Sequence, residues 1–100
     1  MAEFLKPSLS AEEVAFLVRS GRPPIRILGP QNGRVEYAIP PQGASFLGTR
    51  KRTESGLEFF SRDGKSRGFA EMVEVDSSLA PAIDAVRDNA LRELGIKPVS

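Results

Sequence analysis

The sequence predicts an α+β fold: an antiparallel meander sheet of about five strands, with an N-terminal and a C-terminal helix packed on one face. A capped amphipathic pattern near the start and a longer one near the end predict the two helices. Between them, short runs of β-branched and aromatic residues alternate with Gly, Pro and Asn turns. Such short connections favour antiparallel neighbours, because a parallel crossover needs a dozen or more residues. The length of 100 residues predicts a single α+β domain spanning 1–100.

The first helix is predicted over Ala11–Ser20. Ser10 and Glu13 have the spacing of a capping box, in which each side chain accepts a hydrogen bond from the other residue's backbone amide. Gly21 suits the left-handed residue that ends a helix. The predicted apolar stripe consists of Val14, Leu17 and Val18.

Three strand candidates follow the first helix. Ile25–Leu28 is short and apolar, and the turn Gly29–Gly33 separates it from Arg34–Ile39, which alternates between apolar and polar residues. Pro40-Pro41 ends that strand, because proline has no backbone amide to donate to a neighbour. Ser45–Thr53 is the third candidate, and its basic second half indicates a strand that leaves the core.

A β-hairpin is predicted over Leu57–Val75, with its turn at Asp63-Gly64. A two-residue loop would set Phe59 opposite Gly68. A four-residue loop would instead place two glutamates directly opposite each other, which is unfavourable, so the shorter loop is preferred.

Each face of this hairpin carries apolar residues. The first face, expected to lie under the helices, holds Leu57, Phe59, Ala70 and Met72. The second face holds Phe60, Phe69, Val73 and Val75. The second face is too apolar to remain in water unless a bulge after Ala70 swaps the side chains or another surface covers it.

The second helix follows Asp76, with Ser77 or Ser78 as its N-cap and Pro81 in its first turn. Gly95 is expected to end it. Its apolar stripe is predicted to contain Leu79, Ile83, Val86, Ala90 and Leu94.

Composition excludes several kinds of chemistry. The chain has no Cys and no His, so it lacks thiolate nucleophiles, disulfides, histidine bases and the commonest transition-metal ligands. Its glycine turns match neither the phosphate-loop spacing nor the dinucleotide-binding fingerprint. The sequence therefore favours a non-enzymatic protein with no metal and no cofactor. With no apolar run long enough to cross a bilayer and no secretion signal, a soluble cytoplasmic protein without membrane contact is expected.

The net charge of +1 is unevenly distributed. Residues 19–67 contain ten Lys or Arg and four Asp or Glu, whereas the rest of the chain has four basic and nine acidic residues. Six of the basic residues are candidates for contacting an anion or a nucleic acid: Arg50, Lys51, Arg52, Arg62, Lys65 and Arg67. Clustered cations bind phosphates and exposed rings stack on bases, so Phe60 and Phe69 could assist them. Solvation of charged strand residues explains the same cluster without a function.

Three functional hypotheses are consistent with these patterns. The first is a binding or assembly protein that forms a homodimer, or docks on another protein, through Phe60, Phe69, Val73 and Val75. The second is a nucleic-acid-binding protein that uses the basic cluster, although a pI of 8.1 is below the strongly basic values usual for such domains. The third is a small-molecule binder in which helices close a cupped sheet over a ligand.

Overall fold

The computed structural model describes residues 9–44 and 49–97. Its elements in chain order are α1 (Ala11–Arg19), β1 (Ile25–Gln31), β2 (Arg34–Ile39), β3 (Thr49–Thr53), β4 (Gly56–Phe60), β5 (Ser66–Phe69), β6 (Glu71–Asp76), the short 3-10 helix η1 (Ser77–Leu79) and α2 (Ala80–Glu93). The predicted α+β class, with helices at both ends and antiparallel strands between them, is confirmed. The first part of the predicted strand Ser45–Thr53, residues 45–48, lies outside the described residues.

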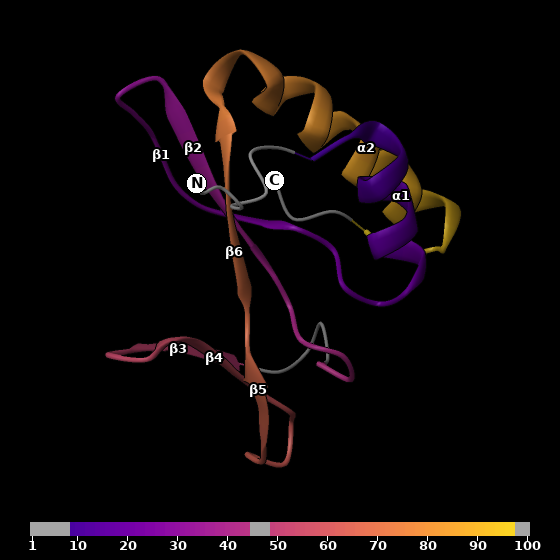
Figure 1. The fold of residues 1–100 in the computed structure, drawn as a ribbon. Coiled ribbons are helices and arrows are strands. Elements are labelled where there is room, and N and C mark those ends of the chain that lie inside the picture. The colour runs from indigo at the N-terminus through magenta and orange to yellow at the C-terminus, as the bar shows by residue number, and fades with distance from the viewer. Residues whose placement is uncertain (1–8, 45–48, 98–100) are drawn as a thin grey trace.

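The described strands form two three-stranded sheets instead of one meander. The helix-covered sheet has the order β1-β2-β6, and the basic sheet has the order β3-β4-β5. Only Ala70 separates β5 from β6, so one nearly continuous run of chain serves both sheets. Figure 1 shows the basic sheet at the start of β6, with the two helices beside the far end of that strand.

The predicted register of the hairpin is confirmed in the body of its strands. Phe59 pairs with Gly68, and the amide of Ala70 extends the ladder by donating to the Leu57 carbonyl at 2.8 Å. Near the turn, the Ser61 amide donates to the Lys65 carbonyl at 2.9 Å, so the loop has three residues, not the predicted two. The register shift between Phe59 and Phe60 absorbs the additional residue.

One predicted cap is present and the other differs. The Glu13 amide donates to Ser10 Oγ at 3.1 Å, and the Ser10 amide donates to Glu13 Oε1 at 3.0 Å, as a capping box requires. The predicted serine cap of the second helix is wrong. The Asp76 carboxylate accepts from the Ser78 amide at 2.9 Å and starts η1, whose last turn leads directly into α2 with Pro81 in its first turn.

The two apolar faces of the predicted hairpin pack in different parts of the core, and the helices cover the part of the second face that lies on β6. Val73 and Val75 are buried with Val14 of α1 and Ile83 of α2. The expectation that the helices cover the first face is therefore wrong. Its members pack between the two sheets in a cluster with residues of β1 and β2: Leu57, Phe59, Ala70 and Met72 with Ile25, Ile27 and Ala38. The inner side of the basic sheet therefore packs against residues of the helix-covered sheet on the side that the helices leave open.

The predicted apolar stripe of α2 is confirmed in its middle, where Ile83 and Ala90 are buried and Val86 packs against the core. The buried residues of α2 are Ala80, Ile83, Ala90 and Leu91. Leu79 and Leu94, which were predicted to belong to the stripe, are both exposed. On α1, Phe16 is also exposed, at 65% of its full area, so it lies outside the core.

A buried tyrosine joins α2 to the middle of the helix-covered sheet. The hydroxyl of Tyr37 donates to Asp84 Oδ1 at 2.7 Å, and the ring is completely buried. Asp84 also accepts ion pairs from Arg26 of β1 at 3.4 Å and from Arg87 of α2 at 3.3 Å. Burial raises the pKa of Tyr37 far above its ordinary value, and the hydrogen bond to Asp84 adds to this shift.

We expect alkaline unfolding to begin when this tyrosine ionises. The folded state holds the proton to a higher pH than the unfolded chain does, so ionisation favours unfolding. The free energy of unfolding should be unaffected by this group below about pH 10 and should fall as the pH rises further. Because Tyr37 is the only tyrosine, phenolate absorbance reports it directly and should appear together with the loss of helical circular dichroism.

Tyr37→Phe is the matching variant. It should lower the free energy of unfolding at neutral pH by about 1–2 kcal/mol through loss of a hydrogen bond to a charged acceptor. It should also remove part of the alkaline decline. A phenolate signal that titrates near pH 10 in a protein that remains folded would contradict this placement of Tyr37.

Candidate functional site

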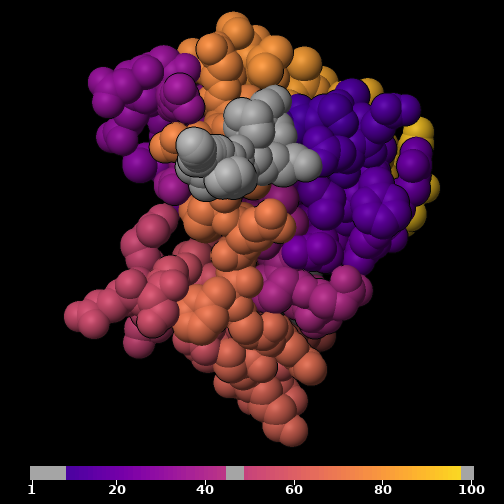
Figure 2. All heavy atoms as spheres, in the orientation of Figure 1, coloured from indigo at the N-terminus to yellow at the C-terminus, as the bar shows by residue number. Residues whose placement is uncertain are grey.

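The six predicted cationic residues all lie on the basic sheet or on its turns. Arg50, Lys51 and Arg52 lie on β3, Arg67 lies on β5, and the remaining two, Arg62 and Lys65, lie at the β4–β5 turn. All six are exposed. In Figure 2 the two turns of this sheet protrude from the rest of the molecule. The fold thus brings together residues that are spread over 18 positions of the chain.

The cations of the basic sheet differ from those elsewhere in having no partners. Within the described ranges, no hydrogen bond or ion pair involves the side chain of any of the six. In contrast, most arginines outside this sheet are engaged by a carboxylate, an amide or a carbonyl oxygen: Arg22, Arg26, Arg34, Arg87 and Arg92. Arg19 and Lys97 are the other described cations without a partner. The basic sheet therefore concentrates positive charge that the fold itself does not use.

The outer face of the basic sheet combines this charge with two phenylalanines. Residues directly opposite each other on antiparallel strands point to the same side. One row across the sheet is Lys51, Glu58 and Phe69, and the next row is Thr49, Phe60 and Ser66. The Phe69 ring lies over Gly56 of β4, where an added Cβ would meet it at 3.6 Å. Phe69 is 46% exposed and Phe60 is half-buried.

The predicted interface of four apolar residues is divided by the fold. Val73 and Val75 have 2% and 0% of their areas exposed, so the prediction that they form part of a contact surface is wrong. The chain's own helices cover them. Phe60 and Phe69 belong to the same predicted face, but they lie on β4 and β5, before Ala70. No helix of the described chain covers them there. These two remain available to a partner.

A short hydrogen-bonded turn fixes the tip of the basic sheet. The Asp63 carboxylate accepts from the Ser61 hydroxyl and from the Lys65 amide. These bonds, aided by the charge of Arg67, lower the pKa of Asp63 below its ordinary value, the bond from Ser61 having the largest effect. The aspartate therefore stays ionised and keeps the turn closed while the flanking cations point to solvent.

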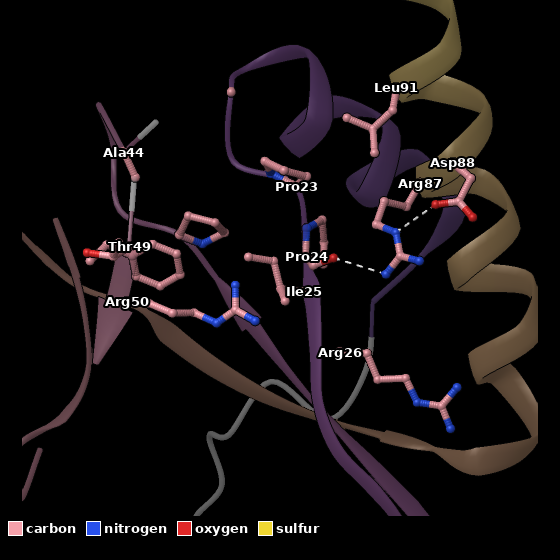
Figure 3. A pocket seen from close by; sticks show the side chains of 13 residues that line it. Pro23, Pro24, Ile25, Arg26, Ala44, Thr49, Arg50, Arg87, Asp88 and Leu91 are labelled. Atoms are coloured by element: carbon pink, nitrogen blue, oxygen red, sulfur yellow. Dashed lines mark hydrogen bonds and ion pairs between the residues drawn. The ribbon is translucent and has the colours of Figure 1, made fainter. Parts of the chain in front are cut away.

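A hollow next to one of these cations, Arg50, lies on the opposite, inner side of β3. It is a cavity of about 350 Å³ between the C-terminal end of α1, the start of β1, α2 and the basic sheet. Figure 3 shows Arg50 extending across it toward Ile25. Sequence patterns could not find this cavity, because its walls come from five separate segments of the chain. Arg50 and Arg52 thus point away from the face of Lys51, and the predicted cluster is split between two sides of one sheet.

No group of acidic residues in the described part of the chain is arranged to hold a metal ion. No helix within 9–44 and 49–97 is long and apolar enough to cross a membrane. Searches of protein-family models, curated proteins and solved structures found no match to this chain.

Core and surface assignments on the second face can be tested by truncation. Val73→Ala and Val75→Ala should each lower the free energy of unfolding by about 2 kcal/mol, because each leaves a cavity beneath the helices. Phe69→Ala removes a larger side chain but should cost less, since the ring is half in water. Leu28→Ala serves as the control for a half-exposed residue of the other sheet. Chemical denaturation measures all four, and a larger loss for Phe69→Ala than for the valines would contradict the assignment.

Proposed function

We propose that this protein is a small non-catalytic binding protein whose basic sheet binds single-stranded nucleic acid across its outer face. The observation that carries the proposal is a group of exposed, unpartnered cations on a sheet whose outer face also presents two phenylalanines: Lys51 on that face, and Arg62, Lys65 and Arg67 at or next to the β4–β5 turn. Phosphates would be neutralised by Lys51 and by the cations at or next to the β4–β5 turn, and bases would stack on the rings.

The charges suit a flexible strand better than a rigid duplex. The cations at the β4–β5 turn lie at one end of the sheet, and Lys51 lies at its edge. A single-stranded nucleic acid that crosses the outer face diagonally can therefore contact both. Phe60 and Phe69 stand in adjacent rows on neighbouring strands, a diagonal separation of about 7–8 Å. Two bases of one strand can be splayed over that distance, whereas paired and stacked bases in a duplex cannot reach the rings.

Stacking has little dependence on base identity, because every base has an aromatic face. Lys and Arg contacts to phosphates also carry no sequence information. We therefore expect binding to single-stranded DNA and RNA with weak sequence preference, and weaker binding to a duplex of the same length.

The charge contribution can be measured by fluorescence anisotropy with a labelled mixed-sequence oligonucleotide over a series of salt concentrations. The logarithm of the affinity should fall linearly with the logarithm of salt, at about 0.7 per phosphate contacted. The double variant Arg62→Gln with Lys65→Gln should reduce that slope by about 1.4. The double variant Arg19→Gln with Lys97→Gln removes the same charge elsewhere and should leave the slope unchanged. Equal effects of the two double variants, or no binding at low salt, would refute the proposal.

The stacking contribution is tested with Phe60→Ala and Phe69→Ala in the same assay. Loss of one stacked base costs about 1–3 kcal/mol, which is roughly a 5- to 150-fold rise in the dissociation constant. Phe16→Ala is the matched control, because it removes an exposed phenylalanine from α1 instead of the basic sheet. The salt slope should be the same in all three variants, since no phosphate contact is lost.

Self-association through Phe60 and Phe69 is the competing explanation for their exposure. Size-exclusion chromatography with light scattering on the unbound protein separates the two. A monomer that binds the oligonucleotide supports the proposal. A dimer that dissociates in the Phe69→Ala variant, together with no binding to nucleic acid, would replace it with homodimer assembly.

A further inference from the structure

A second site, independent of the outer face, lies in the cavity on the inner side of β3. Its volume of about 350 Å³ is within the range of small-molecule sites. The apolar part of its lining consists of Pro23, Pro24, Ile25, Pro40, Ala44, Phe59 and Leu91. The charged part consists of Arg26, Arg50, Arg87 and Asp88.

Of the charged groups, only Arg50 is uncompensated. Arg87 donates to Asp88 at 3.0 Å and pairs with Asp84 at 3.3 Å, and Arg26 pairs with Asp84 at 3.4 Å. No described residue accepts a hydrogen bond from Arg50, whose guanidinium crosses the cavity in Figure 3. The cavity therefore carries one free positive charge with five unused donors facing largely apolar walls.

The walls are held in place by hydrogen bonds from two other arginines. Arg22 Nε donates to the Pro40 carbonyl at 2.8 Å and fixes the end of β2 to the segment after α1. Arg87 donates to the Pro24 carbonyl at 3.3 Å and fixes the entry to β1 against α2. Three prolines add backbone stiffness to these walls. The cavity is thus formed before any ligand enters, which reduces the entropy lost on binding.

We propose that this cavity binds a small organic carboxylate with a flat or extended apolar body. The carboxylate pairs with the Arg50 guanidinium, which can donate two parallel hydrogen bonds to it. The apolar body lies against the apolar part of the lining, which includes Phe59, Leu91 and the prolines. A highly charged ligand such as a nucleoside triphosphate does not fit this chemistry, because one free cation would face several negative charges and Asp88 stands nearby.

The experiment is isothermal titration of the full chain with 1-naphthoate and with decanoate. A neutral isostere, 1-naphthamide, tests the need for charge. We expect the wild type to bind 1-naphthoate with a dissociation constant of about 1 mM or tighter. Arg50→Gln should weaken 1-naphthoate binding about tenfold or more, and should leave the weak binding of 1-naphthamide unchanged. Ala44→Trp should block both compounds by filling the cavity.

Arg52→Gln is the matched control. Arg52 lies two residues further along the same strand and on the same side, but it does not line the cavity. Its substitution removes the same charge and should leave 1-naphthoate binding unchanged. Equal weakening by Arg50→Gln and Arg52→Gln, or equal affinity of the wild type for 1-naphthoate and 1-naphthamide, would overturn the proposal. So would a wild type that binds neither carboxylate.

Localisation of the bound probe completes the test. In methyl-resolved NMR spectra, saturating 1-naphthoate should shift the signals of Ile25, Ala44 and Leu91, and should not shift Val73 or Val75. An unlabelled oligonucleotide should not displace the probe, because the outer face lies on the other side of the sheet. Shifts confined to residues outside the cavity lining would refute the site.

Discussion

The packing of the two sheets and the helices depends on one strand, β6, whose apolar side chains need to be shielded from water on both of its sides. In β6, Val73 and Val75 require cover on one side and Met72 requires cover on the other. Two helices supply the first cover. The second cover comes from the chain's own basic sheet, whose Leu57 and Phe59 pack in one cluster with Met72. Removing either layer would expose one row of apolar side chains to water.

The packing of the basic sheet against the other sheet has a direct consequence for charge. Once its inner side is folded onto the other sheet, the basic sheet has a single buried face, and residues on its edge and turns are left in water. Cations there remain solvated at little cost. Near α2 the situation is the reverse: the buried hydroxyl of Tyr37 and the partly buried guanidinium of Arg87 need an acceptor, and Asp84 provides it. The acidic residues of α2 therefore stabilise the fold, whereas the basic residues of β3 and the β4–β5 turn are free to act on another molecule.

Local signals in the sequence were sufficient for part of the local structure. The capping box at Ser10 and Glu13 and the register of Phe59 with Gly68 depend on neighbouring residues, and both were predicted correctly. The face that the helices cover was predicted wrongly. The alternation of apolar residues continues through Ala70, so the sequence does not indicate that the chain passes there from one sheet to the other. A serine was predicted as the cap of α2, because the sequence does not reveal the 3-10 turn η1. That turn comes before α2 and has Asp76 as its cap. The cavity could not be predicted at all, since only the packing of distant segments creates it.

Edge strand β3 explains how one short basic segment can serve two different surfaces. Successive residues of a strand point to opposite sides, so Lys51 faces outward beside Glu58 and Phe69, while Arg50 faces inward beside Phe59. In sequence the three cations 50–52 are one cluster, and no property of composition separates them. In the fold, Lys51 shares its face with two rings suited to stacking, whereas Arg50 faces an apolar hollow suited to a single anion. Alternation of the strand therefore converts one run of charge into two chemically distinct environments, and substitutions at adjacent positions should affect different ligands.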